Sequence, residues 1–122
     1  MINREKTDMS IERIDAEQRW SEAVIYNGTV YYTSVPDNLD DDATAQTANA
    51  LAAVDVLLAR VGSDKSRILD ATIFLADAAD FAAMNAAWDA WVSAGSAPVR
   101  CTVQARLMNP KYKVEIKIIA AQ

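Results

Sequence analysis

Two side chains near the C-terminus have the types needed to hold a small organic acid and to activate water. Arg100 follows a proline and a valine, and Glu115 has a lysine two residues away on either side. A guanidinium grips a carboxylate through two parallel N–H donors, which a lysine ammonium cannot match. A carboxylate can orient a water molecule and accept its proton. Because an imine carbon is already electrophilic, this pair would need no metal or strong nucleophile to hydrolyse one.

The segment that carries Arg100 and Glu115 has the pattern of a β-hairpin. Residues 99–107 and 114–118 alternate apolar and polar side chains, with the turn signal Asn109-Pro110 between them. If the two strands pair antiparallel about that turn, Arg100 and Glu115 share one face within a few residues of each other. The pattern therefore predicts a single site containing both. The alternative for each residue is a surface ion pair without a functional role.

Length, composition and charge exclude several classes of protein. The chain has 122 residues, enough for one domain, and 52% of them are apolar. Its net charge of −5, without a basic patch interleaved with aromatics, disfavours nucleic acid as a partner. No apolar stretch approaches the ~20 residues of a membrane span, and the N-terminus lacks a secretory signal. We therefore expect a soluble, cytoplasmic protein with neither a nucleic-acid nor a membrane partner.

The chain contains no histidine and one cysteine. Without histidine there are no His-based triads and the commonest metal ligand is missing, so we expect no metal and no cofactor. A single cysteine can form no internal disulfide, which agrees with a reducing compartment. We expect Cys101 to be a packing residue rather than a reactive thiol.

The N-terminal third indicates a leader followed by strands. Residues 1–8 are polar and aperiodic, and we predict a disordered leader there, or an alternative start at Met9, before one domain over residues 9–122. Ile11 and Ile14 fit a short strand. Residues 23–34 form two β-rich runs joined by Asn27-Gly28, the signature of a type I′ hairpin.

The middle of the chain predicts two helices around one strand. Helical spacing of apolar residues indicates helices over residues 43–61 and 79–93, with an apolar strand over residues 68–76 between them. We expect the strand to present Leu69, Ala71, Ile73 and Leu75 on one face. The buried stripe of the second helix is predicted to be Phe81, Met84, Trp88 and Trp91.

These elements define an α+β fold with a five- to six-stranded mixed sheet. Two amphipathic helices can cover only one face of such a sheet. The terminal strands nevertheless carry apolar residues on both faces. We therefore expect a second copy of the chain to cover the remaining surface, in a homo-oligomer.

Several short motifs, in order and at nearly constant spacing, resemble the Rid family, the reactive intermediate imine/enamine deaminases of the YjgF type. The resemblance runs from Ile11 to Ala121 and is closest to the bacterial YoaB-type branch. Its segments are Ser21-Glu-Ala-Val24, Asn27-Gly28, Thr33-Ser34, Gln46-Thr47, Asp80-Phe-Ala-Ala-Met-Asn85, Trp88-Asp-Ala-Trp91, Pro98-Val-Arg100, Asn109-Pro-Lys-Tyr-Lys113 and Val114-Glu-Ile116.

The resemblance implies a chorismate-mutase-like fold, a homotrimer and three clefts between subunits. It assigns the substrate carboxylate to Arg100 and the hydrolytic water to Glu115. It also places Ser34 and Asn85 in the cleft, and we expect backbone groups around Arg100 and Thr102 to contact the imine. No metal or cofactor is implied.

Two positions depart from the family pattern. Trp20 replaces a phenol, which keeps a flat wall but loses the hydroxyl, and Val35 replaces a glycine, which narrows the cleft. The leading expectation is hydrolysis of small 2-imino or enamine acids to 2-oxo acids and ammonia. The alternative is a trimer that binds or senses a small carboxylate-bearing metabolite, such as a 2-oxo acid, without turnover. RNA cleavage is disfavoured by the acidic charge and by the lack of histidine.

Overall fold

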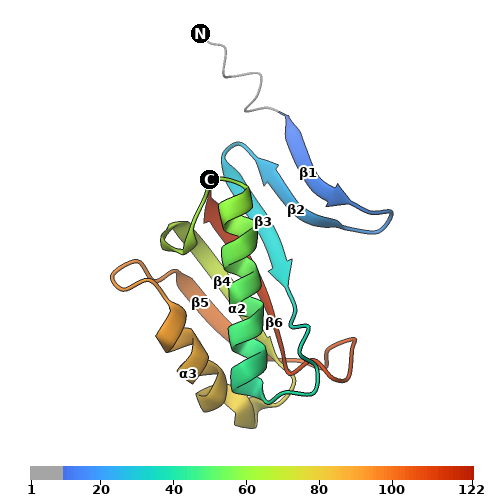
Figure 1. Ribbon diagram of the computed structural model, residues 1–122, viewed down its shortest axis with the longest axis vertical. Coiled ribbons are helices and arrows are strands. Elements are labelled where there is room, and N and C mark those ends of the chain that lie inside the picture. Colours follow the sequence, from blue (N-terminus) through green and yellow to red (C-terminus); the bar gives the residue numbers. More distant parts are fainter. Residues whose placement is uncertain (1–9) are drawn as a thin grey trace.

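The computed structural model describes residues 10–122, so the predicted leader at residues 1–8 lies outside the described residues. Over residues 10–122, six strands, two helices and two short 3-10 turns follow one another (Figure 1). The strands are β1 (Ile11–Ala16), β2 (Ser21–Tyr26), β3 (Thr29–Ser34), β4 (Ile68–Leu75), β5 (Val99–Gln104) and β6 (Val114–Ala121). The helices are α2 (Ala43–Arg60) and α3 (Phe81–Trp91), and the 3-10 turns are η1 (Lys65–Arg67) and η2 (Ala78–Asp80).

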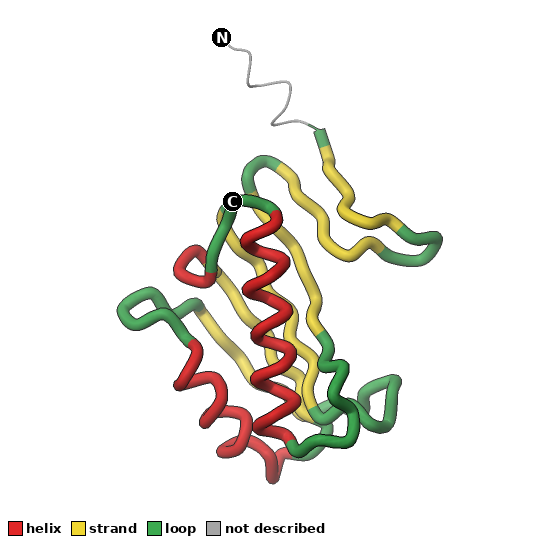
Figure 2. The backbone as a smooth tube through the Cα atoms, viewed as in Figure 1, coloured by secondary structure: helices red, strands yellow, loops and turns green. Residues whose placement is uncertain are grey.

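The strands form one mixed sheet in the order β1-β2-β3-β6-β4-β5. Only β4 and β5 pair in parallel, since α3 connects them as a crossover. Both helices lie on one face of the sheet (Figures 1 and 2). The predicted α+β architecture, with two helices on one face of a five- to six-stranded mixed sheet, is therefore confirmed, and the sheet has six strands.

Local signals in the sequence fix where these elements begin and end. The β2–β3 turn places Asn27 at φ 53° and Gly28 at φ 74°, the left-handed conformation that this pair tolerates. The carboxylate of Asp42 caps α2 by accepting a hydrogen bond from the backbone N–H of Ala45 at 2.9 Å. Gly62, at φ 82°, follows the end of α2.

The core lies between the helices and the covered face of the sheet. The side chains of α2 at Leu51, Val54 and Leu58 are fully buried, and Met84 and Trp88 of α3 close the same layer. The sheet contributes Ala71, Ile73 and Leu75 from β4 and Val114, Ile116 and Ile118 from β6. This packing fixes which face of each strand points toward the helices.

The predicted hairpin between the last two strands is wrong. β5 pairs with β4 in parallel, whereas β6 lies between β3 and β4 and is antiparallel to both. The strands β5 and β6, which are consecutive in the sequence, are therefore separated by β4 in the sheet. Arg100 and Glu115 cannot face each other across a ladder.

Two details of the predicted apolar faces are also wrong. Leu69 does not share a face with Ala71, because a register shift between Ile68 and Asp70 displaces it, and it is 52% exposed. Phe81 is the first residue of α3, lies outside the core and is 47% exposed. Met84 and Trp88 are buried as predicted.

The other face of the sheet has no helix on it. Its exposed apolar side chains include Tyr31, Leu69, Val99 and Val103. The prediction that Val99 and Val103 lie on the opposite face of β5 from Arg100 is confirmed. Arg100 is on the face that is turned toward the helices, and the two valines are on the uncovered face. Within residues 10–122, neither helix is long and apolar enough to cross a lipid bilayer.

Candidate functional site

Arg100 lies on β5, the edge strand of the sheet, and its side chain reaches toward α3. Its Nη1 donates a hydrogen bond to Oδ1 of Asn85 at 2.8 Å, and its guanidinium lies 5.1 Å from the ring centroid of Trp88. The side chain is half-buried. Among residues 10–122 it has no carboxylate partner within ion-pair distance. The positive charge is thus held in place by neutral groups and remains available to an anion.

Thr102 follows Arg100 on the same face of β5. Residues 100 and 102 oppose Ala71 and Ile73 of β4, which both point toward the helices. The Oγ1 atom of Thr102 is buried without a hydrogen-bond partner among the described residues. An unpaired buried hydroxyl costs about 1–3 kcal/mol, which a polar atom arriving with a ligand or a second chain would offset.

A small cavity borders Thr102. It has a volume of about 280 Å³ and is lined by Leu75, Ala78, Phe81, Thr102 and Gln104. Its walls come from β4, η2, the first residue of α3 and β5. Most of this lining is apolar, and none of it is charged.

Glu115 lies on β6 and points away from the helices. Its register partner is Phe74 of β4, whereas the flanking Val114 and Ile116 are buried in the core. Glu115 is half-buried, and no ion pair within residues 10–122 involves it. The glutamate and Arg100 therefore occupy opposite faces of the sheet within one chain.

A cavity of about 600 Å³ lies beside β2 and β3. Trp20 and Val35, the two departures from the family pattern, both line it, together with Tyr31, Tyr32 and Lys117. Lys117 follows Glu115 on the same face of β6. Trp20 is 59% exposed and Val35 is 38% exposed, so both are free to contact a ligand or a second chain.

Tyr31 and Tyr32 reach this cavity from opposite faces of β3. The pairing of β2 with β3 ends at Ala23 and Tyr32, and beyond that pair the two strands diverge. Burial raises the pKa of the Tyr32 phenol, with a hydrogen bond to Ser34 acting in the opposite direction, so the phenol is protonated at neutral pH. Sequence reasoning gave Tyr32 no role, although it lines the same cavity as Trp20.

Ser34 is not open to a cleft within one chain. Its side chain is 1% exposed, and its hydroxyl donates to the backbone carbonyl of Ala50 on α2 at 2.8 Å. This bond anchors the end of β3 to α2, just before Val35. In the described chain Ser34 is thus a packing residue that positions the strand end.

The candidate residues form two separate groups. Arg100, Asn85 and Thr102 lie at the β5 edge, on the helix side. Trp20 and Val35 lie at the cavity beside β2 and β3, and Glu115 is on the open face of β6 nearby. The sheet order places two strands between β5 and β3, which corresponds to about 14 Å at the usual strand spacing. Within one described chain the two groups therefore lie apart.

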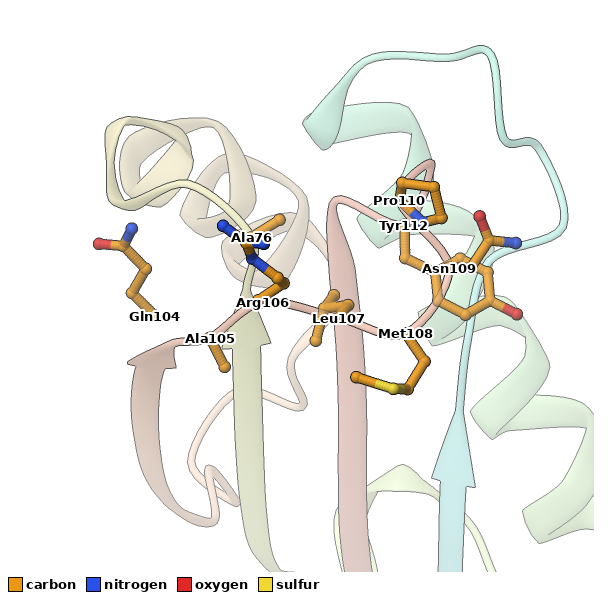
Figure 3. Close-up of a pocket in the computed structure, with 9 residues that line it drawn as sticks. All are labelled: Ala76, Gln104, Ala105, Arg106, Leu107, Met108, Asn109, Pro110 and Tyr112. Carbon is orange, nitrogen blue, oxygen red and sulfur yellow. The ribbon is translucent and has the colours of Figure 1, made fainter.

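Another cavity contains neither Arg100 nor Glu115. It has a volume of about 760 Å³ and lies at the loop between β5 and β6. Figure 3 shows Gln104 and Arg106 on one side of it and Asn109 and Tyr112 on the other. Within residues 10–122, no three Cys, Asp or Glu side chains cluster in a way that could hold a metal ion.

The fold and the site define a class of protein. It is a small α+β domain with a mixed six-stranded sheet, two helices on one face, and an arginine at the sheet edge that has no acidic partner among the described residues. Comparison with protein families matches residues 10–122 to the model described as Endoribonuclease L-PSP. The chain belongs to this family, which includes the YjgF and RutC proteins.

Three relatives show how near the likeness is. The chain is 74% identical to the RutC family protein YoaB of Escherichia coli K12 over 113 residues, covering 93% of this chain and 99% of that protein. A solved structure of a YjgF family member from Neisseria meningitidis is 47% identical, with a TM-score of 0.91 over 94% of this chain and 97% of that one. A 2-iminobutanoate/2-iminopropanoate deaminase of Salmonella typhimurium is 28% identical, over 81% of this chain and 79% of that protein.

Proposed function

We propose that the protein hydrolyses 2-imino acids, or their enamine tautomers, to 2-oxo acids and ammonia. The observation that carries the proposal is Arg100, whose guanidinium is held by Asn85 and Trp88 without an acidic partner among the described residues. Such a group suits the carboxylate of a small metabolite. The deaminase name of the Salmonella relative supports the same reaction class.

In this reaction Arg100 binds the carboxylate of the protonated imine. Glu115 orients a water molecule and accepts one of its protons as the oxygen bonds to the imine carbon. The resulting carbinolamine carries a hydroxyl and an amino group on that carbon. Transfer of that proton to nitrogen makes ammonia the leaving group, and as the C–N bond breaks the hydroxyl proton passes to Glu115, which leaves the 2-oxo acid; the released ammonia then takes this proton as ammonium. Every step uses only substrate, water and this carboxylate.

The active unit is a homotrimer in which the two groups of residues come from different copies. Support comes from the position of Arg100 and Glu115 on opposite faces of one sheet, and from the exposed apolar side chains on the uncovered face. One copy supplies Arg100, Asn85 and Thr102. Its neighbour supplies Glu115, with Trp20 at the wall of the cleft and Ser34 holding the strand end.

A mixing experiment tests this proposal. Wild-type protein should accelerate the loss of an imino acid generated in situ by an amino-acid oxidase, while Arg100→Ala and Glu115→Gln should each be inactive. Because each site takes one residue from each of two chains, co-refolding equal amounts of the two variants should restore about a quarter of the wild-type activity. An Arg100→Ala protein as active as the wild type would refute the role of Arg100. Mixtures without recovered activity would refute the shared site.

A second function is binding or sensing of a small 2-oxo acid without turnover. It is favoured by Trp20 and Val35, which line the same cavity and change both its wall and its width relative to the family pattern. Thermal-shift titration with pyruvate and 2-oxobutyrate, run beside the hydrolysis assay, separates the two functions. Stabilisation by these acids with no acceleration of imine loss would favour the binding role.

A further inference from the structure

We propose that the 280 Å³ cavity beside Thr102 receives the substrate's side chain and selects 2-imino acids with an apolar side chain about as large as that of leucine or methionine. This inference rests on the proposed function and names the substrate class of the same site. It distinguishes this protein from one that acts only on the smallest imino acids.

The cavity lies directly beside the carboxylate-binding group. Arg100 and Thr102 share one face of β5 and are about 7 Å apart along the strand. Arg100 contacts Met84 and Asn85, and Phe81 precedes them by one turn on the same side of α3. The guanidinium and the cavity therefore lie next to each other in the space between β5 and α3. An acid bound at Arg100 can extend its remaining carbon chain toward Phe81.

The lining indicates what kind of group fits. Leu75 is 1% exposed, while Phe81 offers a ring that is 47% exposed. Ala78 has the smallest side chain of the lining and leaves the space open. None of the lining residues is charged, so a charged side chain would lose its hydration there without a partner. An apolar side chain would instead gain from being removed from water.

The size of the cavity sets an upper limit on the group. Sites for drug-sized ligands usually measure about 300–1,000 Å³, so a volume of about 280 Å³ accommodates part of a metabolite. A methyl group would leave most of this space empty. Since one methylene in an apolar pocket typically changes kcat/KM by about tenfold or more, a four-carbon chain should be strongly preferred to a methyl group.

Two alanines of the same 3-10 turn allow a matched test. Ala78 lines the cavity, whereas Ala79 is equally exposed but does not. Ala78→Leu should fill the cavity, and Ala79→Leu adds the same side chain outside it. The first readout is the affinity for pyruvate and for 4-methyl-2-oxopentanoate, the 2-oxo products of the smaller and the larger substrate. The second is kcat/KM for the corresponding imino acids.

The wild type and Ala79→Leu should bind 4-methyl-2-oxopentanoate at least tenfold more tightly than pyruvate and show the same ratio in kcat/KM. Ala78→Leu should lose this preference while keeping its affinity for pyruvate within about twofold. Turnover without a preference for the larger acid, or equal losses for both acids in Ala78→Leu, would overturn the inference and leave the proposed function standing. The binding preference without any turnover would support the cavity assignment and refute the hydrolytic function.

Discussion

At the scale of single residues, the guanidinium of Arg100 is held in position by two neutral side chains, Asn85 and Trp88. A carboxylate in place of Asn85 would hold the guanidinium more strongly, but it would also neutralise the charge that is proposed to bind the substrate. The amide of Asn85 fixes the orientation of Arg100 and leaves its charge free. This choice distinguishes an arginine that binds an anion from one that stabilises the fold.

Asn85→Asp tests that distinction with a nearly isosteric change. Hydrogen bonds to charged groups contribute about 1.5–3 kcal/mol, so an internal carboxylate that competes for Arg100 should raise KM roughly 30-fold. The melting temperature should stay the same or rise. Ala86→Asp, which adds the same charge at an exposed position one residue away, should change KM less than threefold. A stable Asn85→Asp protein with unchanged KM would contradict the assigned role of Arg100.

Asp15 and Arg60 form another residue-scale contact that bears on the site. The carboxylate of Asp15 accepts hydrogen bonds from Arg60 Nη1 at 2.7 Å and from Nη2 at 3.1 Å, linking the end of β1 to the end of α2. Asp15 adopts φ 49°, a conformation for which Asp and Asn are enriched. Trp20 lies in the turn that follows β1 and lines the 600 Å³ cavity.

The hydrogen bond from Arg60 holds the pKa of Asp15 below its usual value of 3.8. Because the pKa is depressed in the folded state, the stability that this pair contributes is present above the ordinary pKa and is lost as the pH falls through the folded value. We expect an NMR titration to show the lowered pKa in the wild type and its return toward 3.8 in Arg60→Gln. Identical Asp15 pKa values in the two proteins would rule out the contact in solution.

At the scale of elements, one buried side chain connects α2 to the beginning of β6. Gln46 is 0% exposed, and its Oε1 accepts a hydrogen bond from the backbone N–H of Lys113 at 2.8 Å. Its Nε2 donates to the carbonyls of Leu39, Asp41 and Lys111. The loop before α2 and the loop before β6 are thereby both fixed to α2. Glu115 lies two residues after Lys113, whose backbone N–H makes one of these hydrogen bonds.

Gln46→Leu should remove the anchor and leave buried backbone groups without partners. We expect the free energy of unfolding to fall by about 2–4 kcal/mol, since each unsatisfied buried group costs about 1–3 kcal/mol. Urea denaturation should show this as a lower midpoint with an unchanged slope. Gln18→Leu, at an exposed position, should stay within about 0.5 kcal/mol of the wild type. A loss below about 1 kcal/mol in Gln46→Leu would mean that water replaces the amide.

The element scale is also where sequence reasoning failed most clearly. Consecutive strands are neighbours in most sheets, and the turn signal at Asn109-Pro110 favoured a hairpin. In the structure that signal lies in a loop, where Tyr112 N–H donates to the carbonyl of Asn109 at 3.0 Å, and the chain passes beyond β4 to pair with β3. Hydrophobic alternation cannot distinguish these two pairings, because β5 and β6 have the same alternation in either one.

At the scale of the whole molecule, the uncovered sheet face requires an explanation. Val99 is 74% exposed and Val103 is 44% exposed on a strand at the edge of the sheet. The proposed trimer would pack against this exposed apolar surface. Self-association would cover it and, in the proposed arrangement, would also bring Arg100 of one copy to Glu115 of another.

Val103→Asp should therefore prevent assembly and abolish activity together. The wild type is expected to sediment with a mass of three 13.3 kDa chains, and the variant with the mass of one. Val56→Asp, at a 71% exposed position on α2, is the matched control and should remain assembled and active. A monomeric Val103→Asp protein with full activity would show that a single chain holds a complete site.

The sequence by itself determined the elements and the α+β class, and it offered Arg100 as the candidate anion-binding residue, because these depend on local periodicity, turn chemistry and side-chain type. Asn27-Gly28 could form only a tight turn, and no histidine was available for other chemistry. Only the tertiary structure decided that β6 lies between β3 and β4 and that Arg100 faces the helices while Glu115 faces away. Alternation assigns residues to two faces but does not say which face is buried. That choice is made by packing between segments far apart in the chain, and it is why the two chemical groups belong to different surfaces of one subunit.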